Sequence, residues 1–437
     1  MNIESALPTF IKNIIKEHHL YIVGGSIRDI LLKKTPQDFD LVGKDIENAL
    51  RHLREKGKIV VLDEKEKEYR IVFRDFWIDL SEMKGESIID DLEKRDFTIN
   101  SIAYDIEAKK LIDPCNGQKD IEKKIIKTCD IENLKMDPLR ILRAFRFYAT
   151  LGFTIEEHTL SWIYKIREML SQVKAERIRL ELLQILASSN VYNTFGIMCD
   201  TKVMDMLFPE VSRLRETSQR YYNNQNLLYH SLMALKYLEE MLKEKEIYYE
   251  PAWILGAFLH DIGKPSTLSY DEEGNTHFHG HDKLGAEILE KELKRLRFST
   301  REIEGAKKVV ALHMYPHHLA SLDNLTKKAV ARFLRRAGEY ADFLFLFALS
   351  DAKASPPREG GMDGYKKLKK LMDEIRNEQR HKQERIITGH DLISLGFKPS
   401  PLFRTILEDV QEEFMAGTLQ NKKEALKYIT KKYKKEV

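Results

Sequence analysis

The sequence predicts an α+β protein in which a mixed α/β head is followed by a long, all-helical body. Short runs of β-forming residues occur only before about residue 130, with amphipathic helical patterns between them. From Pro138 onward strand signals almost disappear, and apolar residues recur at helical spacing. We therefore expect a mixed sheet in the head and an elongated helical body.

Each expected element has a local signal. The runs rich in β-branched and aromatic residues predict strands at Leu20–Val23, Phe39–Val42, Lys58–Leu62, Tyr69–Phe73, Trp77–Leu80 and Ile102–Tyr104. Helical spacing of apolar residues predicts helices at Ser26–Leu32, Ile46–Glu55, Ile141–Leu151, Arg177–Leu186, Leu227–Leu242 and Leu325–Arg335. Turn-forming residues indicate breaks near Ser188–Asn190, Tyr222–Gln225, Asp271–Asn275 and Ser355–Gly361.

Composition limits the class of protein. The 437 residues are enough for two to four domains. The 72 basic residues nearly balance 69 acidic ones, so a nucleic-acid binder would have to concentrate positive charge locally. Three cysteines, Cys115, Cys129 and Cys199, are too few and too widely spaced for a disulfide framework. Since neither a signal peptide nor a membrane span is evident, we expect a cytoplasmic protein with no membrane partner.

The strongest chemical signal is a pair of glycines followed by a pair of aspartates. A β-run enters Gly24-Gly25 and a helical run leaves them, so the backbone can approach a phosphate at a helix N-terminus. Asp38 and Asp40 are two apart on an expected strand, so both carboxylates project from one face. They suit two Mg²⁺ ions that activate an attacking hydroxyl and stabilise a leaving pyrophosphate, with Asp79 as a candidate third carboxylate. Alone, Gly-Gly is usually a turn and Asp-x-Asp a surface pair, but together they are specific.

The string Gly24-Gly25-Ser26-Ile27-Arg28-Asp29, followed by Asp38-Phe39-Asp40, resembles the signature of the class II tRNA nucleotidyltransferase and bacterial poly(A) polymerase family, within the polymerase-β-like superfamily. The similarity extends over roughly residues 15–190, and Ile112-Asp113-Pro114 with Gly117 is similar to a short turn of the family. The resemblance implies a polymerase-β-like nucleotidyltransferase head that holds ribose and triphosphate through a second motif, Lys94–Ser101. It also implies a base-selecting helix that begins at Asp137. The implied nucleotide-binding residues are Gly24, Gly25, Ser26, Arg28, Asp29, Arg95, Asp96, Asn100, Asp137, Arg140, Arg143 and Arg146.

Template-free choice of base can be argued from two side chains. Asp137 and Arg140 are three residues apart, so we expect them to share one helix face. The carboxylate accepts from the amino group of cytosine or adenine, and the guanidinium donates to the adjacent ring nitrogen. Uracil and guanine present the reverse pattern, and each mismatched buried group costs about 1–3 kcal/mol. The other interpretation of Asp-x-x-Arg is a surface ion pair on a helix.

Two departures from the family pattern bear on function. Met136 stands where the family commonly has Glu, which leaves the orientation of Asp137 and Arg140 open. The family members that add a whole CCA carry a flexible segment rich in Arg, Pro and aromatic residues before the second motif. Here that interval is Ser81–Glu93, which is short, acidic and free of those residues. It is similar to the subset that adds only CC and leaves the final A to a separate enzyme.

A second constellation lies in the helical body. Imidazole and carboxylate together suit a transition metal such as Mn²⁺, Ni²⁺ or Zn²⁺, which can activate water for phosphoester hydrolysis. The pattern resembles the HD phosphohydrolase superfamily, which implies an HD-type helical domain. A lone histidine is usually a core or surface residue, and a site of this kind can also be only structural. The implied ligands are His230, His260, Asp261, His281, His313 and Asp351.

These features divide the chain into four expected parts: a catalytic head (1–133), a nucleotide-selecting neck and body (134–215), an HD-type metal-binding domain (216–375) and a basic C-terminal tail (376–437). The lysine-rich end is either a solvated face or a contact to tRNA phosphates. The expected activity is addition of nucleotides from CTP, and in some subtypes ATP, to the tRNA 3′ end, with contacts to the acceptor and TΨC region. We expect CC addition; full CCA addition, A addition or poly(A) synthesis, and an HD phosphohydrolase acting on RNA ends are the alternatives.

Overall fold

The computed structural model describes residues 3–218, 225–355, 362–383, 386–415 and 418–433. The chain forms two compact units. The first is Met1–His313 with Leu346–Pro356, and the second is Met314–Phe345 with Pro357–Val437. Among the described residues, no helix is long and apolar enough to cross a membrane. The expected breaks at Tyr222–Gln225 and Ser355–Gly361 fall almost entirely outside the described residues.

The first unit begins with a seven-stranded mixed sheet in the order β3-β4-β5-β2-β1-β6-β7. The pairing of β2 with β5 is parallel, and the other pairings are antiparallel. The expected mixed sheet is therefore confirmed, and β7 is a strand that the sequence had not indicated. The strands are β1 (Tyr21–Val23), β2 (Asp38–Gly43), β3 (Lys58–Asp63), β4 (Glu68–Val72), β5 (Trp77–Glu82), β6 (Ala103–Asp105) and β7 (Lys110–Ile112).

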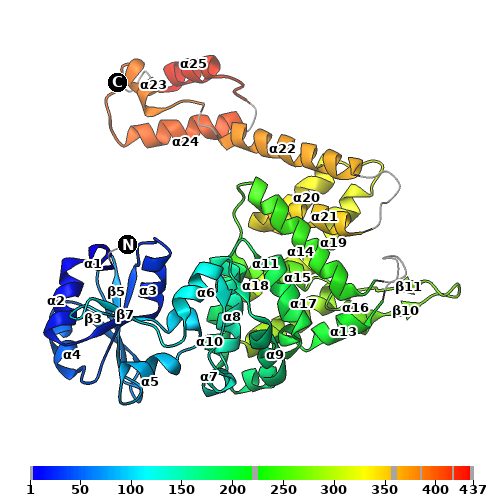
Figure 1. Ribbon diagram of the computed structural model, residues 1–437. Coiled ribbons are helices and arrows are strands. Elements are labelled where there is room, and N and C mark those ends of the chain that lie inside the picture. Colours follow the sequence, from blue (N-terminus) through cyan, green and yellow to red (C-terminus); the bar gives the residue numbers. More distant parts are fainter. Residues whose placement is uncertain (1–2, 219–224, 356–361, 384–385, 416–417, 434–437) are drawn as a thin grey trace. The chain divides into compact units, whose positions relative to one another are not determined.

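The sheet is accompanied by helices of the head (Figure 1), which form where apolar residues recur at helical spacing. In α2 the buried residues are Ile11, Ile14 and Ile15, and in α4 they are Ala49, Leu50 and Leu53, which are helical spacings. Helix α3 starts directly at the end of β1, so the turn between them has no spare residue. The helices are α1 (Ile3–Ala6), α2 (Thr9–Glu17), α3 (Gly24–Leu31), α4 (Glu47–Arg54), α5 (Ile88–Glu93), the 3₁₀ turn η1 (Thr98–Asn100) and α6 (Gly117–Lys123).

The remainder of the first unit is helical, as expected, apart from two-residue strands. Strand β8 (Ile125–Ile126) pairs with β9 (Thr154–Ile155), and β10 (Ser269–Tyr270) pairs with β11 (Thr276–His277). The neck contains α7 (Ile131–Met136), α8 (Arg140–Leu151), α9 (Glu157–Ile166), η2 (Arg167–Gln172), α10 (Ala175–Leu186), α11 (Val191–Asp200), α12 (Val203–Leu207) and α13 (Glu210–Glu216). The following helices are α14 (Leu227–Glu244), α15 (Pro251–Phe258), α16 (Lys264–Thr267), α17 (His281–Arg295) and α18 (Thr300–Leu312).

The regular elements in the described residues of the second unit are all helices. They are α19 (Met314–Ala320), α20 (Lys327–Ala337), η4 (Gly338–Tyr340), the start of α21 (Ala341–Ala354), α22 (Asp363–Gln383), α23 (Gly389–Ser394), α24 (Leu402–Met415) and α25 (Lys422–Tyr433). The last three enclose an apolar cluster that includes Leu392, Ile406, Val410 and Ile429. The described part of the lysine-rich end, Lys422–Tyr433, is thus a helix with an apolar face.

Candidate active site and metal centre

Two strands bring three carboxylates together. Asp38 and Asp40 project from the same face of β2, and Asp40 lies opposite Asp79 in the parallel pairing with β5. The Gly24–Ser26 motif is hydrogen-bonded to β2. The Gly25 N–H donates to Asp40 Oδ2 at 3.0 Å, and the Ser26 hydroxyl accepts from the Asp40 N–H at 2.8 Å. The two sequence motifs therefore form one structural unit.

Position 24 accepts only glycine, for two structural reasons. Its φ is +64°, a conformation that residues with a Cβ rarely adopt. A Cβ at this position would also lie 2.9 Å from Arg95 Nη1 and 3.0 Å from Asp40 Oδ2. The absence of a side chain thus lets an arginine of the second motif approach the carboxylates.

The carboxylates of Asp38, Asp40 and Asp79 lie close together and partly buried, so they repel one another. Burial raises the pKa of Asp40 to about 6, with Arg95 opposing this and Asp38 and Asp79 adding to it. Burial also raises the pKa of Asp38, and the nearby Asp29 and Asp79 contribute. A shared divalent cation would relieve this repulsion, and oxygen ligands on one face suit Mg²⁺. Asp79 is held by Arg70 of β4 through two hydrogen bonds of 2.7 Å, a partner that the sequence had not indicated.

The second motif is organised around Asp96. Its carboxylate accepts from the Phe97 N–H, from Asn100 Nδ2 and from Arg143, whose Nη2 lies at 2.6 Å. Burial would raise the pKa of Asp96, but Arg143 and Arg140 outweigh it and hold the pKa well below its usual value. Arg28 in turn donates to Asn100 Oδ1 at 2.9 Å. Asp96 is therefore an ionised hub that positions arginines from two helices.

A pocket of about 340 Å³ lies beside these groups. Of the predicted site residues, its lining contains Asp40, Asp79, Arg95, Asp96, Asp137, Arg140 and Arg143. It also contains residues that the motifs did not indicate, among them Tyr69, Lys84 and Arg177. The predicted residues outside the lining are Asp38, Gly24, Gly25, Ser26, Arg28, Asp29, Asn100 and Arg146.

Residues outside the pocket lining have partners that explain their place. Arg28 pairs with Asp29 at 2.8 Å, and Arg146 pairs with Glu181 of α10 at 2.7 Å. Arg146 also lies over the Phe147 ring, 4.3 Å from its centroid. These contacts link the predicted arginines to the framework around the pocket. Their part in nucleotide binding stays a prediction.

The expected placement of Asp137 on the same helix as Arg140 is wrong. Asp137 caps the end of α7 in an extended conformation, and α8 begins at Arg140. The cause is Pro138, because a residue before proline is driven away from helical geometry. Both side chains nevertheless line the same pocket. Arg140 Nη1 donates to the carbonyls of Lys94 and Asn133, and the two Asp137 oxygens accept from Arg177 of α10.

The histidine–aspartate cluster of the body is assembled from separate helices. His230 comes from α14, His260 and Asp261 follow α15, His281 begins α17 and His313 follows α18 (Figure 1). Asp351 lies on α21, in the part that belongs to the same unit. The six predicted residues form two adjoining triads, His230–His260–Asp351 and Asp261–His281–His313, each with ligand atoms within 4.8 Å of one another.

Hydrogen bonds set the imidazoles for metal binding. Nδ1 of His260, His281 and His313 lies 2.7–2.9 Å from the carbonyls of Ala257, Phe278 and Val310. A carbonyl only accepts, so Nδ1 carries the proton and Nε2 presents its lone pair in the neutral ring. These Nε2 atoms face Asp261, at 3.2, 3.6 and 4.0 Å from its carboxylate. The donor set therefore fits a transition-metal centre.

Charge and packing keep this cluster compact. Burial opposes ionisation of Asp261, but His260 and Lys264 outweigh it and hold its pKa well below the usual value. Lys264 Nζ lies 2.7 Å from Asp261 Oδ2. A Cβ on Gly263 would lie 2.2 Å from the carbonyl oxygen of His281, so this glycine allows α17 to pack against the His-Asp turn.

Three family models match the chain in consecutive segments. They are the poly A polymerase head domain at residues 20–127, the probable RNA and SrmB-binding site of polymerase A at residues 152–214, and the HD domain at residues 227–378.

Curated relatives match almost the full length. The A-adding tRNA nucleotidyltransferase of Deinococcus radiodurans is 28% identical over 93% of this chain and 94% of its own. The CC-adding tRNA nucleotidyltransferase of Synechocystis sp. is 28% identical over 93% and 92%. The CCA-adding enzyme of Bacillus cytotoxicus is 28% identical over 94% and 93%. Among solved structures, the Thermotoga maritima CCA-adding enzyme complexed with tRNA has a TM-score of 0.61 at 22% identity, covering 98% of this chain and 96% of that one, which shows the same fold.

Proposed function

Because the chain belongs to the family of tRNA nucleotidyltransferases and poly(A) polymerases, we propose that it adds nucleotides to the 3′ end of tRNA without a template. One observation carries the proposal. Asp38, Asp40 and Asp79 lie on two neighbouring central strands of the sheet, next to Gly24 and Gly25, and the pocket beside them is lined by arginines and lysines. Carboxylates for a metal and cations for a triphosphate are what nucleotidyl transfer requires.

In the proposed reaction the 3′-hydroxyl of the RNA attacks the α-phosphate of the nucleotide, and pyrophosphate leaves. Mg²⁺ bound at Asp38 and Asp40 would supply activation of the hydroxyl and charge neutralisation of the leaving group. Arg95 is held by Asp91 at 3.0 Å and its Nη1 lies beside Gly24, near the Asp40 carboxylate, so we propose that it binds the phosphates. Asp96 orients Arg143 beside the same pocket. The protein's contribution is thus positioning and electrostatic stabilisation.

For base selection we propose that Asp137 and Arg140 contact the Watson–Crick edge of cytosine or adenine. The fixed bonds from Arg140 Nη1 to two backbone carbonyls support this role, because they orient the guanidinium before a nucleotide binds. Arg177 supports it as well, since it holds the Asp137 carboxylate at the pocket. Uracil and guanine would leave two groups mismatched, which corresponds to discrimination on the order of 10² or more against these bases.

We further propose that addition stops after CC. The interval before the second motif is not only short but tied down. The N–H groups of Lys84, Glu86 and Ser87 donate to Asp91 or Asp90 of α5, and Ser87 forms a capping box with Asp90. These hydrogen bonds restrain the segment, and so they oppose the large change in the shape of the nucleotide pocket that a switch from cytosine to a purine requires. Curated relatives include CC-, A- and CCA-adding enzymes, so A addition and full CCA addition are the alternatives that the product must exclude.

A second candidate function rests on the two triads of the body. We propose that they bind Mn²⁺, Ni²⁺ or Zn²⁺, which when present would activate water for hydrolysis of 2′,3′-cyclic phosphates or phosphomonoesters. The convergence of four imidazoles and two carboxylates supports the metal site. We also propose that residues 376–437 contact the phosphates of the tRNA backbone. In this proposal the chain consists of a catalytic head, a nucleotide-selecting neck and body, an HD-type metal-binding domain and this basic tail.

The substrate class can be tested with labelled nucleotides. We would supply labelled CTP or ATP with a tRNA lacking CCA, a tRNA lacking only A, a complete tRNA and an unstructured RNA. The proposal expects incorporation of C into the first tRNA and little into the complete tRNA or the unstructured RNA. Long A tails on any RNA would instead identify a poly(A) polymerase. Hydrolysis of phosphate esters at the RNA end, without incorporation of labelled nucleotide, would favour the phosphohydrolase alternative.

A further inference from the structure

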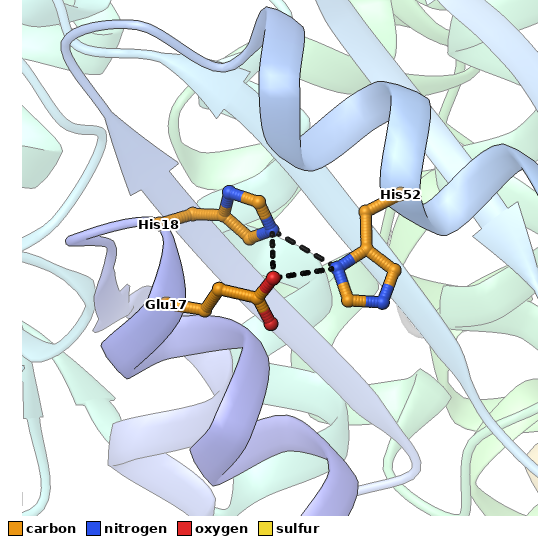
Figure 2. A group of neighbouring side chains, drawn as sticks. All are labelled: Glu17, His18 and His52. Atoms are coloured by element: carbon orange, nitrogen blue, oxygen red, sulfur yellow. Dashed lines mark hydrogen bonds and ion pairs between the residues drawn. The ribbon is translucent and has the colours of Figure 1, made fainter.

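A third group of metal-binding side chains lies in the head, apart from both sites described above. Glu17 is the last residue of α2, His18 caps that helix and His52 lies in α4. Figure 2 shows the three side chains pointing toward one another. None of the three lines the pocket beside Asp40 and Asp79, so the group is separate from the proposed transfer site.

The three ligand atoms form a triangle of the size that a metal ion requires. His18 Nε2 lies 3.1 Å from His52 Nδ1, and Glu17 Oε1 lies 3.4 Å from His52 Nδ1 and 4.0 Å from His18 Nε2. A point equidistant from these atoms lies about 2.1 Å from each, and Zn–N and Zn–O bonds are about 2.0–2.2 Å long. An ion at that point lies in the plane of the three atoms, so a small movement of the side chains would give the tetrahedral arrangement that Zn²⁺ prefers.

The chemistry of the donors selects the class of ion. Two imidazole nitrogens and one carboxylate oxygen suit Zn²⁺ or a similar transition metal, whereas Mg²⁺ and Ca²⁺ prefer oxygen ligands. The rings meet edge to face, with centroids 5.4 Å apart. His18 Nε2 and His52 Nδ1 are close enough to share a proton in a hydrogen bond, and a cation could take the place of that proton. A shared cation satisfies all three at once.

The ligands are held by buried structure and open to water on one side. The His18 N–H donates to the Ile14 carbonyl at 3.1 Å, and His52 is followed by the buried Leu53. Side-chain exposure is 12% for His18 and 24% for His52, whereas Glu17 is 56% exposed. Three protein ligands therefore leave a fourth position that water can occupy.

We propose that Glu17, His18 and His52 bind one divalent transition-metal ion, Zn²⁺ by its donor preference, which links the end of α2 to α4. The ion binds the folded head and not the unfolded chain, so it stabilises the head. The site is a structural clamp and takes no part in nucleotidyl transfer.

The test uses the full-length protein, stripped with a chelator and dialysed against Zn²⁺ alone. Elemental analysis should give one equivalent of Zn²⁺ per chain fewer for the double variant His18→Gln/His52→Gln than for the parent. The matched control is His19→Gln, because His19 is 80% exposed and pairs with Glu107 outside the cluster. It should keep every equivalent. Added Zn²⁺ should raise the unfolding temperature of the stripped parent more than that of the double variant.

A second variant decides the matter if the double variant does not fold. Glu17→Gln changes an exposed side chain, and it should weaken Zn²⁺ binding at this site by about 10-fold or more. Equal stoichiometry in the parent and the folded double variant would overturn the proposal. Unchanged affinity in Glu17→Gln would overturn it as well, and would leave His18 and His52 as a hydrogen-bonded pair.

Discussion

The carboxylate of Asp137 is held by the guanidinium of Arg177 through hydrogen bonds of 2.8 and 3.2 Å. Arg177 lies 40 residues further along the chain, on α10, and no motif pointed to it. In the related family a Glu commonly precedes this Asp, but here Met136 stands there and is 60% exposed. Arg177 therefore supplies the orientation that the neighbouring residue does not.

The first prediction concerns this pair. Arg177→Ala should reduce discrimination of CTP against UTP and GTP by about 10-fold, because Asp137 loses its charged hydrogen bonds and its fixed direction. The affinity for the triphosphate should change less. Competition assays with mixed nucleotides would measure the ratio. Arg179→Ala is the matched control, since Arg179 lies on the same helix but pairs with Glu302. Equal rejection of UTP and GTP by the variant and the parent would show that Arg177 does not act on the base.

The second prediction concerns the metal ligands. Asp38→Ala or Asp40→Ala should lower nucleotide incorporation by about 10³-fold or more, since each removes an oxygen ligand needed to stabilise the transferring phosphate. Binding of tRNA should survive, and a filter-binding assay would measure it. The control is Asp45→Ala, an exposed carboxylate in the loop that follows the same strand. Substantial nucleotide incorporation by a variant that carries both Asp38→Ala and Asp40→Ala would refute the role of this pair.

The third prediction concerns stability and pH. Asp96 has a lowered pKa in the folded protein, so it stabilises the fold above the unfolded pKa of about 3.9, and this stability is lost as the pH falls toward the folded value. Asp96→Asn should destabilise the head by about 1–3 kcal/mol at pH 7, because the half-buried Arg143 loses its charged hydrogen-bond partner. The difference should shrink by about 1 kcal/mol per pH unit below roughly pH 4.

Urea unfolding of the parent and the Asp96→Asn variant at several pH values would measure that dependence. Asp75→Asn, which changes an exposed carboxylate, serves as the control. A destabilisation by Asp96→Asn that stays constant down to pH 3 would mean that the Asp96 charge does not stabilise the fold.

The fourth prediction concerns the triads of the body. The full-length protein should bind Mn²⁺, Ni²⁺ or Zn²⁺ at this centre, and His260→Ala/Asp261→Ala should lose that metal while nucleotide incorporation continues. His158→Gln, an exposed histidine on α9, is the control for nonspecific binding. Elemental analysis and an assay with a 2′,3′-cyclic nucleotide would report metal and hydrolysis separately. Metal content equal in the parent and the double variant would argue against the centre.

Elements with strong local patterns could be predicted from the sequence, often to within two residues. The strand at Asp38–Gly43 and the helix at Arg140–Leu151 are examples, because alternation and helical spacing are properties of consecutive residues. Strand β7 was missed, since three residues, Lys110–Ile112, are too short to show alternation. The break between Asp137 and Arg140 was missed although Pro138 signalled it.

The site was predicted where its residues belong to motifs and missed where tertiary contacts bring them together. Nothing in the order of the chain links Arg70 to Asp79 across β4 and β5, or His52 to His18. Partners of this kind depend on sheet order and helix packing, which local patterns do not determine.

The most direct test of the central claim is the length of the product. The purified protein would be given a tRNA lacking CCA together with CTP, ATP and Mg²⁺, and the products would be resolved at single-nucleotide resolution. We predict a dominant product two nucleotides longer, ending in CC, because the segment before the second motif is short and tied to α5. A product three nucleotides longer and ending in A would contradict CC-only addition. No extension of this tRNA, or of one that lacks only A, would contradict the nucleotidyltransferase account itself.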